Sequence, residues 1–125
     1  MIKTRRGLNL PISGRPEQVV HPGPAVHTVG LIGDDYPGLK PTMLVREGDR
    51  VRGGQPLFSD KRNPGVAFTA PASGTVTAVN RGAKRALRSV VITCDGADPL
   101  AFEAVDPDRA ARAAVVDLLV TSGLW

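Results

Sequence analysis

The side chains with the greatest capacity for chemistry are two histidines and one cysteine. His21 and His27 stand six residues apart in the segment His-Pro-Gly-Pro-Ala-Val-His, whose turns could bring both rings to one metal ion. No third ligand stands at a typical spacing, and a separation of six residues fits no common metal site. Cys94 is the single cysteine, so it has no partner for an internal disulfide. We therefore predict neither a metal site nor a catalytic residue in this chain.

A cluster of basic side chains is the clearest electrostatic signal. The chain carries 16 basic and 12 acidic groups, yet residues 63–94 hold four basic groups and no acidic one, whereas residues 95–125 have a net charge of −4. Such a cluster can face phosphates, anionic lipid headgroups or an acidic partner, and the alternative is a solvated loop. The predicted docking patch consists of Arg81, Lys84, Arg85 and Arg88.

Nucleic acid is a weak candidate for the partner of this basic patch. Proteins that bind single strands stack the bases on aromatic side chains. Only 4% of the residues are aromatic, and the three phenylalanines fall in predicted strands as core residues. We therefore predict no nucleic-acid binding.

Short strands joined by turns must position these residues. The 14 glycines and 11 prolines are spread along the whole chain, which favours β structure. Asp106 as an N-cap, Pro107 at the first helical position and Gly123 as a stop predict one amphipathic helix over residues 107–121. We predict strands over residues 8–12, 26–32, 42–45, 56–59, 66–69, 75–79, 87–94 and 100–102.

The domain organisation follows from the change from predicted strands to a predicted helix. Residues 1–103 form the predicted β domain, and residues 104–125 form a linker and helix that lead into a following domain. The chain ends on the large apolar residues Leu124 and Trp125, which gain by burial, so we expect a fragment of a longer protein. No apolar run approaches the roughly 20 residues of a membrane helix, and no transmembrane segment is predicted.

Two turn segments that contain glycine, residues 46–58 and 70–76, indicate the fold more precisely and are called the two corners. Residues 46–58 contain a turn at Glu47-Gly48-Asp49 and a second reversal at Gly53-Gly54, for which we expect positive φ. Residues 70–76, Ala-Pro-Ala-Ser-Gly-Thr-Val, form an extended entry, a sharp bend at Gly74 and a strand. In this order the two corners resemble the biotinyl/lipoyl-type barrel-sandwich hybrid, in which two β layers enclose a small core.

In carrier members of that superfamily, a lysine at the tip of the hairpin between the corners carries biotin or lipoate. Lys61 is the only lysine in the corresponding segment, residues 59–65, and the Met-Lys-Met pattern of biotin carriers is missing. Lys61 also stands nine residues before Ala70. We interpret it as a solvated turn residue and keep the carrier domain as an alternative.

A closer resemblance covers almost the whole chain. It is carried by residues 7–14 (Gly-Leu-Asn-Leu-Pro-Ile-Ser-Gly), 16–18, 35–43, 60–66, 68–74, 80–85 and 89–92. These signatures, in this order, resemble the N-terminal part of the NqrA family, the A subunits of the sodium-translocating NADH:quinone oxidoreductase. The C subunit of the Rnf electron-transport complex shares the barrel and is the runner-up.

The resemblance implies a peripheral subunit on the cytoplasmic face of the bacterial inner membrane, within a six-subunit sodium-pumping respiratory complex. NADH, flavins, iron–sulfur centres and ubiquinone are expected in other subunits, which are the expected partners. One cysteine cannot ligate an iron–sulfur cluster, so we predict no cofactor and no catalysis for this fragment itself. A structural and interfacial role near the quinone end follows.

One loop is a candidate for that contact. Residues 34–41 form a proline-stiffened turn that holds Tyr36 and Leu39, followed by Lys40. An aromatic ring with a polar hydroxyl beside an aliphatic side chain suits a partner subunit or a quinone ring. The alternative is a loop whose tyrosine packs on its own barrel.

Overall fold

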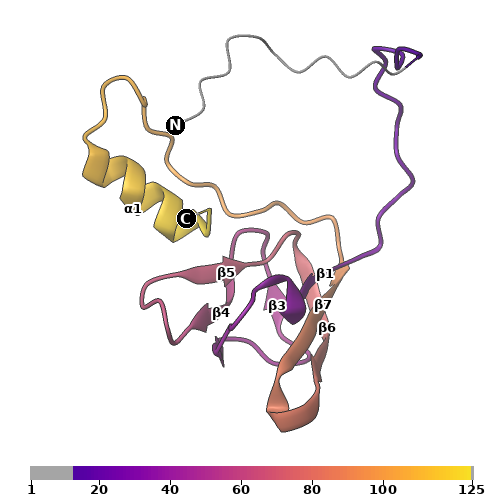
Figure 1. Ribbon diagram of the computed structural model, residues 1–125, viewed down its shortest axis with the longest axis vertical. Helices are drawn as coiled ribbons and strands as arrows, with labels where there is room; N and C mark the ends of the chain where they lie inside the picture. The colour runs from indigo at the N-terminus through magenta and orange to yellow at the C-terminus, as the bar shows by residue number, and fades with distance from the viewer. Residues whose placement is uncertain (1–12, 125) are drawn as a thin grey trace.

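Two small β-sheets and one helix make up the computed structural model, which describes residues 13–124 (Figure 1). The strands are β1 (Thr28–Ile32), β2 (Pro41–Met43), β3 (Arg50–Val51), β4 (Pro56–Asp60), β5 (Ala67–Thr69), β6 (Gly74–Arg81) and β7 (Leu87–Cys94). Two short 3-10 turns, η1 (Gly33–Asp35) and η2 (Ala83–Arg85), and the helix α1 (Arg112–Ser122) complete the described elements. No helix in this part of the chain is long and apolar enough to cross a membrane.

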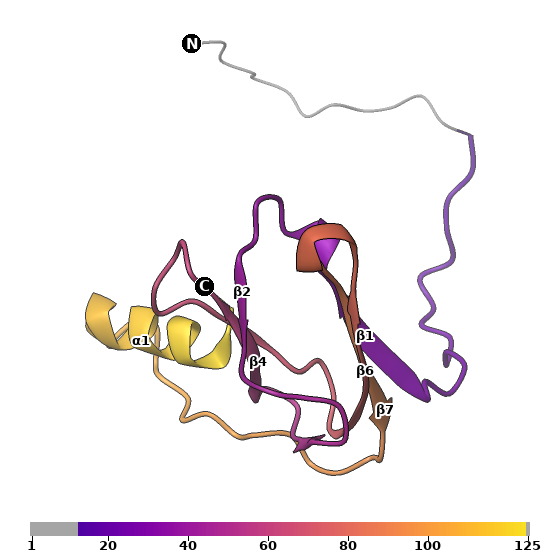
Figure 2. The same ribbon diagram turned by 90° about the horizontal axis from the view of Figure 1, so that it is seen from below.

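The two sheets face each other as layers (Figure 2). One has the strand order β1-β7-β6-β3 and the other β2-β4-β5, and every pairing is antiparallel. β6 and β7 form the longest pair, which contains register shifts between Val76 and Ala78 and between Asn80 and Arg81. Such bulges bend a strand and increase its twist, which suits a barrel that must close over a small core. The mainly β barrel-sandwich prediction is confirmed.

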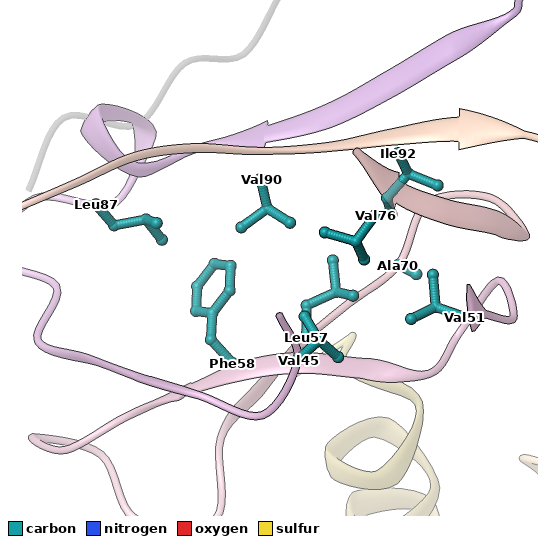
Figure 3. Close-up of a cluster of buried hydrophobic side chains, with 9 residues drawn as sticks. All are labelled: Val45, Val51, Leu57, Phe58, Ala70, Val76, Leu87, Val90 and Ile92. Carbon is teal, nitrogen blue, oxygen red and sulfur yellow. The ribbon is translucent and has the colours of Figure 1, made fainter. Parts of the chain in front are cut away.

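The core lies between the layers (Figure 3). Side chains of β6 and β7 point toward those of β4. In β4 the two consecutive residues Leu57 and Phe58 are both buried, at the register shift between Pro56 and Phe58. Phe58 and Leu57 of β4 and Ile92 of β7 are among the largest side chains that are fully buried. The complete core cluster is Val45, Val51, Leu57, Phe58, Ala70, Val76, Leu87, Val90 and Ile92.

The two glycine corners lie against each other. The Gly54 N–H donates to the Ala70 carbonyl at 2.8 Å, and the Gly53 N–H donates to the Ser73 hydroxyl at 2.8 Å. Gly48 and Gly54 have positive φ values of 90° and 85°, which confirms the expectation for Gly54. The expectation was wrong for Gly53, which instead leaves room for Ala72 and for Pro99, 3.0 Å from where its Cβ would lie.

Gly74 also has a different role from the expected bend. It begins β6, and its φ is outside the left-handed region. A methyl group there would overlap the Thr93 carbonyl of β7. Glycine is therefore needed for the close approach of two backbones.

The strand predictions hold for the central elements and fail at the edges. The predicted strands at 26–32, 42–45, 56–59, 66–69, 75–79 and 87–94 correspond to β1, β2, β4, β5, β6 and β7 with shifted ends, and β3 was missed. The strand at 100–102 was wrong, because Leu100 donates its N–H to the Gly53 carbonyl at 2.7 Å and the chain then runs on without pairing. The prediction for residues 8–12 lies outside the described residues.

The helix begins later than predicted. The Asp106 carboxylate accepts the Asp108 N–H at 3.0 Å and its carbonyl accepts the Ala110 N–H at 2.8 Å, which closes a separate turn before the helix. The N-cap of α1 is Ala111, with no side-chain cap. Gly123 ends the helix in the left-handed conformation as expected, with φ 76°. Helix α1 lies beside β5, and the division at residue 103 stays a prediction.

Candidate functional site

The basic side chains of the predicted patch surround the turn between β6 and β7. Lys84 and Arg85 both have positive φ, 53° and 61°, a conformation that costs an L-residue roughly 1–2 kcal/mol. Hydrogen bonds hold the turn in place: the Gly82 N–H donates to the Ala86 carbonyl at 2.8 Å, and the Ala86 N–H donates to the Ala83 carbonyl at 3.1 Å. The turn is therefore a fixed but strained platform for two neighbouring cations.

The four basic residues have different roles. Nη1 of Arg88 contacts Oδ2 of Asp34 at 2.7 Å, and both side chains are exposed, so this ion pair adds little stability. Nη1 of Arg81 donates to the Arg85 carbonyl at 3.2 Å and braces the turn. Lys84 and Arg85 are exposed and have no ion pair with any described residue. These two charges are the ones available to a partner.

The Tyr36 loop packs partly on its own barrel. The Tyr36 ring meets Phe68 edge to face with centroids 4.5 Å apart, and Phe68 stacks on Phe58 at 4.8 Å. Leu39 is partly buried and packs against the core, whereas Lys40 is exposed. This arrangement favours the alternative for Tyr36, in which its ring packs on the barrel, although the side chain is only half-buried.

The structure brings the two predicted contact regions to one end of the barrel. Gly33 lies so close to the Leu87 backbone that a methyl group there would overlap the Leu87 carbonyl, which joins η1 to the start of β7. A hollow of about 190 Å³ lies at this junction, lined by residues 33–34 and 36–39 and by Ala86 and Leu87. Lys40 does not line it. The Tyr36 loop and the β6–β7 turn stand at the same end in Figure 2.

Asp60 organises a third loop at this end. Its carboxylate accepts the backbone N–H groups of Lys40 and Arg62, both at 3.1 Å, and the Asn63 side-chain amide at 2.8 Å. The Arg62 N–H is the main cause that holds the pKa of the Asp60 carboxyl below its ordinary value, against the opposing effect of burial. Sequence reasoning gave Asp60 no site role, because an aspartate before Lys-Arg-Asn-Pro-Gly is an ordinary turn signal.

The loop fixed by Asp60 adds basic side chains to the same end. The Lys61 N–H donates to the Lys40 carbonyl at 3.0 Å, so the turn after β4 lies beside the entry to β2. The Arg62 guanidinium lies against Gly38 of the Tyr36 loop. Lys61 and Arg62 are exposed. The basic surface thus extends beyond the four residues predicted.

The histidines and the cysteine occupy separate positions. His21 is exposed in the extended segment before β1, and His27 is exposed in the position directly before β1. Cys94 is half-buried at the end of β7. Within residues 13–124, no three histidine, cysteine, aspartate or glutamate side chains gather as metal ligands.

Comparison with known proteins identifies the family. Residues 2–95 match the family model of the NqrA N-terminal barrel-sandwich hybrid domain. The chain belongs to this family. It is 53% identical over 128 aligned residues to the A subunit of the Na(+)-translocating NADH-quinone reductase from Neisseria meningitidis serogroup C, 54% to that from Histophilus somni and 52% to that from Yersinia pseudotuberculosis. Each alignment covers 100% of the chain and 29% of the relative.

Membership of the NqrA family confirms the predicted resemblance. The relatives are all A subunits of the sodium-translocating enzyme, which supports neither the Rnf-type protein nor the carrier domain. The chain spans less than a third of the length of these relatives, so it corresponds to their barrel-sandwich region and its immediate continuation.

Proposed function

We propose that this chain is the interfacial N-terminal region of NqrA in a sodium-pumping NADH:quinone reductase, docked on other subunits at the cytoplasmic face near the quinone end. The observation that carries the proposal is the meeting of two separately predicted contact regions, the Tyr36 loop and the β6–β7 turn, at one end of a protein of the NqrA family. An exposed, strained and charged turn beside a hollow of mixed polar and apolar lining is typical of a surface that binds a partner.

We further propose that the redox chemistry belongs to other subunits, where NADH, the flavins, the iron–sulfur centres and ubiquinone bind. Iron–sulfur clusters require several cysteines, and this chain has one. No general acid and base face each other in the hollow, whose titratable lining groups are Asp34 and Tyr36. The isolated chain is therefore expected to have no catalytic activity.

Two kinds of ligand compete for the hollow beside Tyr36. Sites for small molecules and cofactors typically enclose about 300–1,000 Å³, whereas this hollow measures about 190 Å³. The Tyr36 ring is also occupied on one side by Phe68. Size and packing favour a single side chain of a partner subunit over a quinone ring, and the quinone contact is the second candidate because Tyr36 and Leu39 offer an apolar lining with a hydroxyl.

The main proposal is tested by isolating the full-length native protein from its host membranes under mild detergent. We expect it to co-purify with the flavin-bearing membrane subunits and with NADH-dependent quinone reduction. A full-length protein that elutes alone, with the quinone reductase intact elsewhere, would contradict the proposal.

Tyr36→Ala and Tyr36→Phe in the assembled enzyme separate the two ligands. Contact with a partner subunit predicts that Tyr36→Ala weakens retention of NqrA while the remaining assembled enzyme keeps its KM for quinone. A rise in that KM, also seen in Tyr36→Phe, favours the quinone contact. Unchanged retention and unchanged kinetics would remove Tyr36 from both roles.

A further inference from the structure

The end of the barrel that carries the hollow is strongly basic. Asp34 is paired with Arg88, and Asp60 is buried and hydrogen-bonded to backbone groups. Asp35 faces solvent, and the exposed Glu47 beside Arg81 accepts the Val79 N–H at 2.8 Å, so the basic groups still outnumber the acidic ones. Three loops, the Tyr36 loop, the turn after β4 and the β6–β7 turn, supply the basic groups. These are Lys40, Lys61, Arg62, Arg81, Lys84, Arg85 and Arg88.

The strain in the β6–β7 turn marks its two free cations. Consecutive left-handed residues in a hairpin turn are typically asparagine and glycine, which adopt this conformation at little cost. Lys84 and Arg85 occupy these positions instead and find no charged partner in the described chain. Backbone strain of this kind persists at functional sites, where the side chain is needed.

The hollow gives the basic surface a socket whose lining is partly polar and partly apolar. Tyr36, Leu39 and Leu87 contribute its apolar lining, and Ala86 places the socket directly beside the two cations. A volume of about 190 Å³ accommodates one leucine- or phenylalanine-sized side chain. A convex partner group is required to fill it.

We propose that this end of the barrel binds an acidic segment of a partner subunit, which places carboxylates against Lys84 and Arg85 and inserts one apolar side chain into the hollow beside Tyr36. The inference rests on the proposed function, since it names the partner chemistry of the same site. A protein segment is favoured over a membrane surface for two reasons. The apolar side chains of the turn are two alanines, Ala83 and Ala86, where an inserting surface would present large apolar residues. A bilayer also offers no single side chain that fills a socket.

The experiment uses full-length NqrA and solubilised partner subunits from a host strain that lacks NqrA. Binding is titrated at 50 and 200 mM salt for the native protein and for Lys84→Gln/Arg85→Gln. We expect the dissociation constant of the variant to rise about tenfold or more at low salt, and its salt dependence to become shallower. The matched control Arg15→Gln/Arg112→Gln removes two exposed charges that belong to none of the three loops, one before β1 and one at the start of α1, and is expected to bind as the native protein does.

A second variant tests the hollow without changing charge. Ala86→Phe fills the socket. If this variant has a lowered unfolding temperature, Ala86→Leu replaces it in the binding measurement. We expect the filled socket to weaken binding about tenfold. Combined with Lys84→Gln/Arg85→Gln, its effect should be less than additive, because both sites contact one segment.

Other outcomes overturn the inference. Equal binding by all variants and the control would remove this end from the contact while leaving the proposed function intact. Binding of the native protein to vesicles of phosphatidylglycerol and phosphatidylethanolamine, lost in the charge variant but kept in Ala86→Phe, would assign the surface to lipid. Failure of the native protein to bind the partner subunits would instead overturn the proposed function itself.

Discussion

Gly74→Ala tests the closest backbone approach in the barrel. Gly74 pairs with Cys94 of β7 on one side and with Val51 of β3 on the other. Its φ is outside the left-handed region, so alanine meets no conformational strain. The added carbon would instead overlap the Thr93 carbonyl oxygen and lie 2.8 Å from its carbonyl carbon and 3.0 Å from the Cα of Cys94.

The magnitude follows from the kind of atoms that must move. Backbone atoms cannot rotate away as a long side chain can, so β6 and β7 must separate, and overpacking of this kind costs about 1–3 kcal/mol. Separation also lengthens or breaks ladder hydrogen bonds, each worth about 0.5–1.5 kcal/mol. We expect a loss of about 2–4 kcal/mol, which lowers the Tm by about 10–25 °C for a folded region of this size.

Two other glycines serve as controls in urea and thermal unfolding followed by circular dichroism. Gly23 has ordinary φ and no atom within 4 Å of an added Cβ, so Gly23→Ala should be close to neutral. Gly96 has φ 73° and equally open surroundings, so Gly96→Ala isolates conformational strain of about 1 kcal/mol. If Gly74→Ala unfolds at the same temperature as Gly23→Ala, the close approach of β6 and β7 is refuted.

Three further predictions concern the core, the acid response and the strained turn. Leu57→Ala, at a residue that is 0% exposed, should lower the free energy of unfolding in urea by about 2–5 kcal/mol. Leu44→Ala, at 55% exposure, should change it by no more than about 0.5 kcal/mol, and similar losses for both variants would contradict the described core. Because the pKa of Asp60 is lowered on folding, its stabilisation is present above the unfolded pKa and disappears as the pH falls through the folded pKa. Asp60→Asn should therefore lose less stability than the native chain between pH 6 and pH 3, and an identical acid response would show that this carboxylate does not contribute. Lys84→Gly should raise the stability by about 0.5–1 kcal/mol over Lys84→Ala, since both remove the charge and only glycine relieves the positive φ, and equal stabilities would refute the strain.

The strands and corners could be predicted because their causes are local. Glycine at positions 48 and 54 allows positive φ whatever surrounds it, and the alternation of residues 75–79 gives a strand one buried face. Of two errors in the predicted elements, one has a distant cause and the other a local one. Leu100 is held by the Gly53 carbonyl and joins no sheet, and Asp106 closes its own turn before the helix starts at Arg112.

The candidate site could be predicted in parts. The basic cluster was visible as a run without acidic residues, and the Tyr36 loop as a proline-stiffened aromatic turn. Their adjacency depends on the pairing of β1 with β7 and on the close approach of Gly33 to the Leu87 backbone, contacts between residues far apart in the sequence. Asp60 received no site role from the sequence because its importance lies in the hydrogen bonds that it accepts from backbone N–H groups, one of them 20 residues away.

The amino-acid sequence by itself determined the family, the β character and the chemical types of the contact residues, because these depend on motifs, turn residues and charge that are fixed by local order. Only the tertiary structure decided that the Tyr36 loop, the turn after β4 and the β6–β7 turn share one end of the barrel, and that Lys84 and Arg85 stay free while Arg81 and Arg88 are engaged. The physical reason is that sheet closure brings together segments far apart in sequence, and which charges then find partners depends on distances that no linear pattern encodes.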